Sequence, residues 1–200
     1  MIERAAGDIE DVPETGFGPR TTPFWGTLGF ITLEGTGFVL AAGSLLYLYA
    51  VNRIWPIGAG PPDKTAGTII TAVLLVSLIP NHLVKRWAEQ KDLRRVRIGL
   101  VIMCLFGIAP LVVRWYEFLS LNIGWSDNAY GSALWLLLGL HTVHLLTDVA
   151  ETMVLTALMF TRHGNSGKRY SDCSDNAFYW DFVVIAWLPI YALIYWMPTR

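Results

Sequence analysis

Five long apolar runs, separated by short polar stretches, dominate the pattern of hydrophobic and polar positions along this chain. Each run is close to the roughly 20 apolar residues that a helix needs to cross a bilayer. Transmembrane β-strands would instead show segments of about ten residues with alternating polarity. The chain is therefore predicted to be all-α, an integral membrane bundle of five transmembrane helices. The predicted spans are residues 24–51, 68–84, 98–119, 130–161 and 178–197.

The polar stretches between the runs predict the domain organisation and the topology. Residues 1–23 hold five acidic residues and no apolar core, unlike a secretory signal peptide, so we expect a polar cytoplasmic tail followed by one transmembrane domain over residues 24–200. The tail and the second and fourth connections together carry eleven Lys and Arg, against three on the opposite side. This bias predicts a cytoplasmic N-terminus and a C-terminus outside.

Composition narrows the function classes. The chain is 54% hydrophobic and 16% charged, whereas a soluble domain has about 25% charged residues. Fifteen Lys and Arg against 16 Asp and Glu argue against a nucleic-acid partner. Cys104 falls in an apolar run and Cys173 in a polar connection, so we expect neither a disulfide nor a Cys-x-x-Cys metal motif.

Several ionisable residues fall inside the predicted spans, where a charge costs about 2.5–3.5 kcal/mol on insertion scales. Glu34 has no basic neighbour in sequence, so it is expected to be protonated or paired with another span. Arg114 and Glu117 are three residues apart, a spacing that allows mutual neutralisation. The fourth span carries one polar stripe at spacings of three, four and three, formed by His141, His144, Asp148 and Glu151.

Three interpretations of the stripe remain open. It can be a contact face between helices with mutually hydrogen-bonded side chains. It can be a metal site, although the Glu-x-x-His pairs of di-iron bundles are missing, and haem ligation is poorly supported because His82 and His163 lie at span ends. It can also be a proton relay, for which no second matching stripe is evident on another span.

An ordered set of motifs resembles subunit III of the haem–copper respiratory oxidases, in its short, five-helix form. Residues 24–35 (FWGTLGFITLEG) resemble its first helix, with Glu34 at the family's intramembrane Glu, and residues 139–144 (GLHTVH) resemble its Gly-Phe-His-Gly-x-His element. Further matches are residues 114–117 (RWYE), 126–132 (SDNAYGS), 179–183 (YWDFV), 187–188 (WL) and 194–196 (IYW).

The resemblance implies a non-catalytic subunit of a proton-pumping cytochrome c oxidase. Haem and copper would reside in subunits I and II, with no catalytic, cofactor-binding or metal-binding residues in this chain. The chain would pack on subunit I, bind phospholipid, and support proton uptake and enzyme stability. We expect Glu34, Glu117, His141 and His144 to form an internal polar cluster, and Arg94, Arg95 and Arg97 to be candidates for lipid headgroups. A bacterial cytoplasmic membrane is expected, with the mitochondrial inner membrane as the alternative.

The chain departs from the family at two places in the motif of the last span. Asp181 stands where the family has His, and Val184 where it has Asp; Asp148 is also an acid in a normally apolar or small stretch. We therefore hypothesise that Asp181 or Asp148 pairs with His141 or His144. Two alternative functions stay open: a related membrane protein of nitric-oxide reductase systems, and a stand-alone transporter or metal protein that uses the polar stripe.

Overall fold

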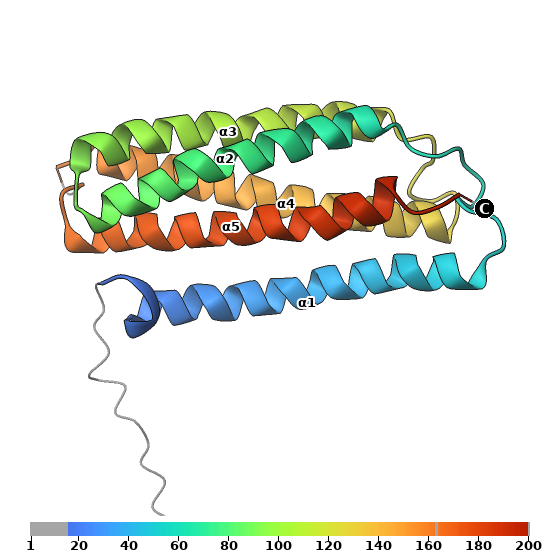
Figure 1. The fold of residues 1–200 in the computed structure, drawn as a ribbon, viewed down its shortest axis with the longest axis horizontal. Helices are drawn as coiled ribbons and strands as arrows, with labels where there is room; N and C mark the ends of the chain where they lie inside the picture. Colours follow the sequence, from blue (N-terminus) through green and yellow to red (C-terminus); the bar gives the residue numbers. More distant parts are fainter. Residues whose placement is uncertain (1–15, 163, 200) are drawn as a thin grey trace, which may run out of the picture.

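Five helices account for most of the protein (Figure 1). The computed structural model describes residues 16–162 and 164–199, so the predicted N-terminal tail lies largely outside the described residues. A short 3₁₀ turn, η2 (Gly18–Arg20), precedes the first helix. The helices are α1 (Thr22–Val51), α2 (Lys64–Glu89), α3 (Leu93–Leu119), α4 (Ala129–Met159) and α5 (Gly167–Tyr195). Each is long and apolar enough to cross a membrane, which confirms the predicted fold class.

Polar residues at the helix starts explain where four of the helices begin. The side chain at each cap accepts a hydrogen bond from a backbone N–H in the first turn, which satisfies a donor that has no partner within the helix. The capping residues are Asp63 for α2, Asp92 for α3, Asn128 for α4 and Ser166 for α5. These caps allow α2 and α3 to extend beyond their apolar runs, and α3 therefore begins five residues before the predicted span.

The start of α5 differs most from the prediction. The polar residues 162–175 were expected to connect two spans, but α5 already begins at Gly167. The first turns of α5 are polar because they face protein: Ser171 and Cys173 are both 1% exposed. The placement of Cys173 in a loop is therefore wrong. The polar residues show where the lipid-facing part of α5 begins, but the helix itself begins about three turns earlier, at Gly167.

The helices form a four-helix ring with a fifth helix on its side. Helix α2 packs against α3 and α5, and α4 packs against the same two helices, which closes the ring. Helix α1 contacts α4 and α5 and lies apart from α2 and α3 (Figure 1). It buries three side chains, Phe38, Ala41 and Leu45, whereas Leu33 and Leu40 are 70% and 72% exposed. Two regions therefore matter below: the ring interior and the seam between α1 and the α4–α5 pair.

The helices alternate in direction, so one end of the bundle gathers the starts of α1, α3 and α5 and the ends of α2 and α4 (Figure 1). We call this the entry end. It contains the basic stretch from Lys85 to Arg97. The side of the membrane on which this end lies remains a prediction from the distribution of Lys and Arg.

Candidate functional site

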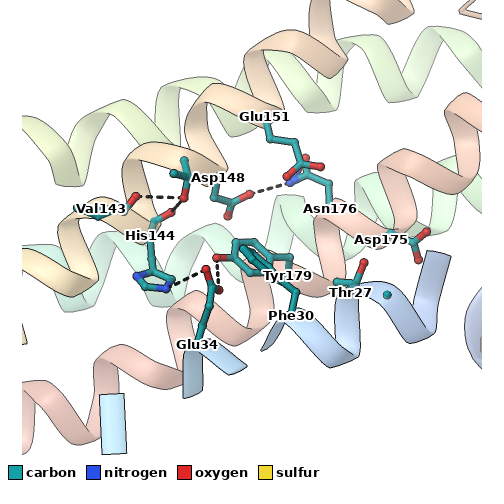
Figure 2. A pocket seen from close by; sticks show the side chains of 12 residues that line it. Thr27, Phe30, Glu34, Val143, His144, Asp148, Glu151, Asp175, Asn176 and Tyr179 are labelled. Atoms are coloured by element: carbon teal, nitrogen blue, oxygen red, sulfur yellow. Dashed lines mark hydrogen bonds and ion pairs between the residues drawn. The ribbon is translucent and has the colours of Figure 1, made fainter. Parts of the chain in front are cut away.

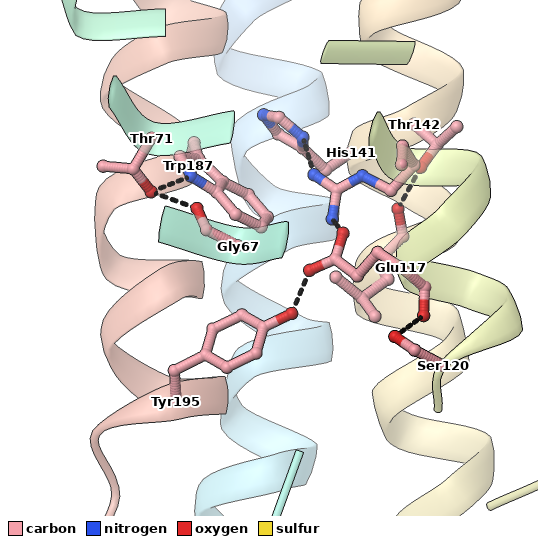
Figure 3. A network of polar contacts seen from close by, with 10 residues as sticks. Gly67, Thr71, Glu117, Ser120, His141, Thr142, Trp187 and Tyr195 are labelled. Atoms are coloured by element: carbon pink, nitrogen blue, oxygen red, sulfur yellow. Dashed lines mark hydrogen bonds and ion pairs between the residues drawn. The ribbon is translucent and has the colours of Figure 1, made fainter. Parts of the chain in front are cut away.

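A buried ion pair sits inside the four-helix ring (Figure 3). Arg114 and Glu117 lie one turn apart on α3, and both side chains are 1% exposed. Arg114 Nη1 donates to Glu117 Oε2, and the hydroxyl of Tyr195 on α5 donates to Glu117 Oε1. The buried carboxylate thus has a donor on each oxygen, an arrangement that offsets the cost of removing the charge from water.

The guanidinium of Arg114 also contacts α4 and α5. Its Nη2 lies 3.2 Å from His141 Nδ1, and its plane lies over the Trp187 ring at 4.2 Å from the centroid. His141 Nε2 lies 3.2 Å from the carbonyl oxygen of Val183. A guanidinium can only donate and a carbonyl can only accept, so His141 is a neutral imidazole with its proton on Nε2. Trp187 continues the network by donating to Thr71 Oγ1 on α2 at 2.7 Å.

We call Arg114, Glu117, His141, Trp187 and Tyr195 the ion-pair cluster. It contains one positive and one negative charge and contacts every helix of the ring, since Thr71 extends it to α2. One polar atom, Arg114 Nε, has no hydrogen-bond partner among the described residues. Nearly all the hydrogen-bonding groups of the cluster therefore have partners. Such a network stabilises the packing of the helices and leaves no reactive group available.

A second polar region lies in the seam between α1, α4 and α5, around a cavity of about 450 Å³ (Figure 2). We call it the acidic cavity. Its ionisable lining residues are Glu34 from α1, His144, Asp148 and Glu151 from α4, and Asp175 and Tyr179 from α5. Arg and Lys are missing from the part of its lining that the described residues form. Asn176, Thr27, Thr147 and the apolar side chains of Phe30 and Val143 complete the wall.

Glu34 joins α1 to both neighbouring helices. Its Oε1 lies 3.1 Å from His144 Nε2, and its Oε2 accepts a hydrogen bond of 2.6 Å from the Tyr179 hydroxyl. His144 Nδ1 lies 2.6 Å from the carbonyl oxygen of Leu140 and must donate to it. The contact between Glu34 and His144 is within ion-pair distance but does not have hydrogen-bond geometry. With Nδ1 protonated, the pair has one further proton to place, on His144 Nε2 or on the Glu34 carboxyl.

Asp148 is the most deeply buried acid of the cavity, with 0% of its surface exposed. Its Oδ1 accepts a hydrogen bond of 2.7 Å from Asn176 Nδ2, whereas its Oδ2 has no partner among the described residues. Asn176 is in turn held by Thr152, whose hydroxyl donates to Asn176 Oδ1 at 3.1 Å. Glu151, one turn further along α4, is exposed at the edge of the cavity.

The hypothesis that Asp148 or Asp181 pairs with His141 or His144 is wrong. Asp181 accepts a hydrogen bond of 2.9 Å from Asn81 Nδ2 and lies 3.4 Å from His82 Nε2, both on α2. An aspartate side chain is short, and Asp181 lies on the α2-facing side of α5, away from the seam that holds His144. Glu34, from another span, is the acid that meets His144 instead.

The polar stripe of the fourth helix divides between the two regions. His141 belongs to the ion-pair cluster, and His144, Asp148 and Glu151 line the acidic cavity. The ring of Phe38 packs against both histidines, at 4.7 Å from His144 and 6.2 Å from His141 between ring centroids. Among residues 16–162 and 164–199, no group of three His, Cys, Asp or Glu side chains is arranged to hold a metal ion.

The three arginines considered for lipid headgroups lie at the entry end and differ in their contacts. Arg97 Nε donates to the carbonyl oxygen of Met159 at 2.7 Å, at the C-terminus of α4. Arg95 pairs with the capping residue Asp92 at 3.2 Å. Arg94 is exposed. A headgroup role stays a prediction for all three, and the side-chain contacts favour it least for Arg97.

Sequence reasoning missed the partners that complete both regions. Tyr195 and Trp187 in the ion-pair cluster, and Asn176 and Tyr179 in the acidic cavity, all come from α5. Spacing along one helix reveals which side chains share a face, but it does not reveal which face of another helix meets them. A Tyr in an apolar run was the available signal for Tyr179 and Tyr195, because such a group needs a partner in hydrocarbon.

Comparison with known proteins relates most of the chain to one family. The family model for cytochrome c oxidase subunit III matches residues 56–199, which include α2 to α5. Cytochrome c oxidase subunit 3 of Drosophila yakuba is 30% identical over 186 residues, covering 86% of this chain and 68% of the relative. The subunit 3 of Artemia franciscana is 26% identical over 193 residues, covering 92% and 70%. That of Aedes aegypti is 28% identical over 179 residues.

Proposed function

Because the chain belongs to the cytochrome c oxidase subunit III family and is thus subunit III of a haem–copper oxidase, we propose that it serves the complex as a non-catalytic membrane subunit. It packs on subunit I, stands next to subunit II, holds phospholipid, and supports proton uptake and the working lifetime of the enzyme. Haem and copper belong to the partner subunits. The observation that carries this proposal is the match over residues 56–199, the complete four-helix ring. The names of the relatives do not favour a nitric-oxide reductase partner or a stand-alone transporter.

Side-chain contacts inside the ring support the non-catalytic role. The deeply buried charges of the ion-pair cluster are directed at one another, and this leaves few polar atoms for a substrate. A brace of this kind fixes the relative positions of α3, α4 and α5. The ring therefore offers a rigid apolar surface for a larger neighbour in the membrane.

The outer surface of α1 supports the lipid and partner contacts. A groove of about 870 Å³ runs between α1 and α4, lined mainly by apolar and small residues, Val39, Leu40, Gly43, Ser44, Tyr47, Leu48, Ala129, Ser132, Ala133 and Leu136. Such a groove suits an acyl chain, since its walls carry few polar groups. At the entry end, the exposure of Arg94 and Arg95 supports a role in binding headgroup phosphates, with Arg97 a weaker candidate.

We assign the complex to a bacterial cytoplasmic membrane, with the entry end in the cytoplasm. The resemblance to the five-helix form supports the first part. The excess of Lys and Arg on the side of the N-terminus supports the second.

Purification through a tag on this chain in mild detergent tests the proposal. We expect haem bands in a reduced-minus-oxidised visible spectrum, together with a large His-rich membrane subunit and a copper-binding subunit identified by mass spectrometry. The preparation should lose oxygen consumption faster during turnover when this chain is removed. A colourless chain that purifies alone and stably folded would contradict the proposal, as would a complex whose turnover lifetime does not change on its removal.

A further inference from the structure

The acidic cavity contains a buried carboxylate oxygen that no side chain satisfies. Asp148 is 0% exposed, lines the cavity, and leaves its Oδ2 without a partner among the described residues. Figure 2 shows its carboxyl group directed toward the space between α4, α5 and the Tyr179 ring. A polar atom buried without a partner costs free energy, so the cavity must supply one. A cavity of this size has room for several water molecules, each of which needs two to four polar partners.

Such partners line the cavity on all three helices. Glu34 Oε1 and His144 Nε2 face each other without a hydrogen bond, and the Asp175 Oδ2 on α5 also has no partner among the described residues. The proton relay considered from the sequence lacked a second polar stripe on another helix. Asp172, Asp175, Asn176 and Tyr179 on α5, at spacings of three, one and three, form that second stripe.

Two neighbouring hollows share lining residues with the cavity and reach the entry end. A hollow of about 620 Å³ shares Glu151 and Asp175 with the cavity and extends to Arg169 and Asp172 in the first turns of α5. Another hollow, of about 270 Å³, shares Asp175 and extends to Lys85 and Glu89 at the end of α2. The shared acids therefore stand between Asp148 and the aqueous surface.

Toward the ring interior, the cavity is followed by groups that already have partners. The Phe38 ring packs against both His144 and His141, and the ring nitrogens of His141 are occupied by Arg114 and by the Val183 carbonyl. The polar lining that the described residues provide is therefore directed toward the entry end. This arrangement favours a proton reservoir.

We propose that the acidic cavity is a water-filled proton-exchange site, in which Asp148 and the Glu34–His144 pair exchange protons with the entry-end surface through Glu151 and Asp175. A hydronium ion at the surface gives its proton to the Glu151 or Asp175 carboxylate. Cavity water then carries a proton from that carboxyl to Asp148 or to Glu34. Each step breaks one O–H bond and forms another, so atoms and charge balance without any other reactant.

The charged surroundings of Asp148 are consistent with this role. Glu34 faces it from α1, His144 and Glu151 from α4, and Asp172, Asp175 and Tyr179 from α5. Arg169 and Lys85 line the two neighbouring hollows at the entry end, where Arg169 pairs with Asp172 at 2.9 Å. Several carboxyl groups that share one low-dielectric space do not all ionise together, so the site retains protons that can be exchanged. That the oxidase uses these protons rests on the proposed function. That the protons exchange with water does not depend on it.

Infrared difference spectroscopy of the intact purified complex tests the proposal. A pH jump should produce the C=O band of a newly protonated carboxyl group, and this band should shift when the buffer is changed to D2O. In the Asp148→Asn variant the Asp148 contribution should be lost. A band that is identical in the variant, or one that resists D2O for hours in the wild type, would show that Asp148 does not exchange.

A second pair of variants keeps the test independent of changes at Asp148 itself. Gly26 lines the cavity, and a Cβ there would meet nothing within 4 Å, so Gly26→Leu should fit and displace water. Gly29 lies on the same helix outside the cavity lining and has the same open space, so Gly29→Leu is the matched control. We expect isotope exchange of the Asp148 band about tenfold slower in Gly26→Leu and unchanged in Gly29→Leu, because exchange requires contact with water. Equal rates in both variants would overturn the water-filled passage, whatever role the chain has in the oxidase.

Discussion

The ion-pair cluster and the acidic cavity use the same kinds of side chain to opposite effect. Each contains a glutamate, a histidine and a tyrosine whose hydroxyl donates to that glutamate: Tyr195 to Glu117 in the cluster, and Tyr179 to Glu34 in the cavity. The cluster adds an arginine within the ring, and its carboxylate is 1% exposed. The cavity adds further acids and open space, and its glutamate is 16% exposed.

The difference shows what decides whether a buried acid is structural. In the ring, Arg114 lies beside Glu117 and the Trp187 ring covers the guanidinium, so charge and volume are both filled. In the seam, α1 packs loosely, and a cavity of about 450 Å³ keeps Asp148 and its neighbours from complete pairing. A satisfied network makes a packing rigid, whereas an unsatisfied one needs water or a ligand. The two regions should therefore respond differently to the same change.

Removing the negative charge of the ion-pair cluster should have the largest effect. Glu117→Gln leaves the Arg114 guanidinium buried without a counter-charge, and breaking a buried pair in this way costs about 3–5 kcal/mol. The free energy of unfolding of this chain, measured by denaturant titration of the purified complex in detergent, should fall by that order. Glu151→Gln on the exposed edge of α4 is the control and should change it by less than about 0.5 kcal/mol.

The double variant Arg114→Gln with Glu117→Gln sharpens this test. With both charges removed, no uncompensated charge remains, and neutral amides at these positions keep hydrogen-bonding capacity toward Tyr195 and His141. Its loss of stability should therefore be smaller than that of Glu117→Gln alone. A double variant that is less stable than the single one would contradict the pairing described for the ring.

A glycine pair tests the contrast in packing density. Gly67 on α2 lies against the Tyr195 ring, and a Cβ there would come within 2.5 Å of Cε2. Gly67→Ala should displace Tyr195 from Glu117 and cost about 1–3 kcal/mol. Gly26→Ala meets nothing within 4 Å and should instead stabilise the helix by about 0.5–1 kcal/mol. Unfolding midpoints that move in the same direction for both variants would remove the distinction between tight ring and loose seam.

Most of the fold could be predicted from the sequence because the hydrocarbon core of a membrane offers no hydrogen-bond partners to the backbone of a span. Backbone groups must be paired within the segment, so a long apolar run becomes a helix. The same reasoning failed at residues 167–177, where the environment is protein rather than lipid. Ser171 and Cys173 are buried against neighbouring helices, and this burial cannot be recognised from hydropathy alone.

For the candidate site, the sequence predicted only which residues of one helix lie on the same face. The Arg114–Glu117 spacing and the polar stripe from His141 to Glu151 followed from the helical period. How the stripe divides between ring and seam depends on partners from other helices, Arg114 on α3 for His141 and Glu34 on α1 for His144. The rotation of each helix about its axis is set by packing, and no pattern within one segment contains that information.

The tyrosine of the acidic cavity should contribute less than its counterpart in the ring. Tyr179→Phe removes one hydrogen bond to Glu34, which keeps its contact with His144 and partial access to solvent. We expect a loss of about 1 kcal/mol, measured by denaturant titration, and weaker attachment of α1. Tyr195→Phe, which leaves a buried oxygen of Glu117 without a donor, should cost more. Equal losses would mean that Glu34 and Glu117 are held in equivalent surroundings.

The smallest effect on stability is expected for Asp148→Asn, although it removes a fully buried charge-bearing group just as Glu117→Gln does. The new amide keeps an oxygen that accepts from Asn176, and its NH2 group takes the place of the oxygen that lacks a partner. Arg and Lys are absent among the described residues that line the cavity, so the substitution leaves neither of them without a counter-charge. The free energy of unfolding should therefore change by no more than about 0.5 kcal/mol, in either direction. A loss as large as that of Glu117→Gln would mean that Asp148 is bound to a cation with every oxygen satisfied, and the acidic cavity would then be a second brace rather than a site of exchange.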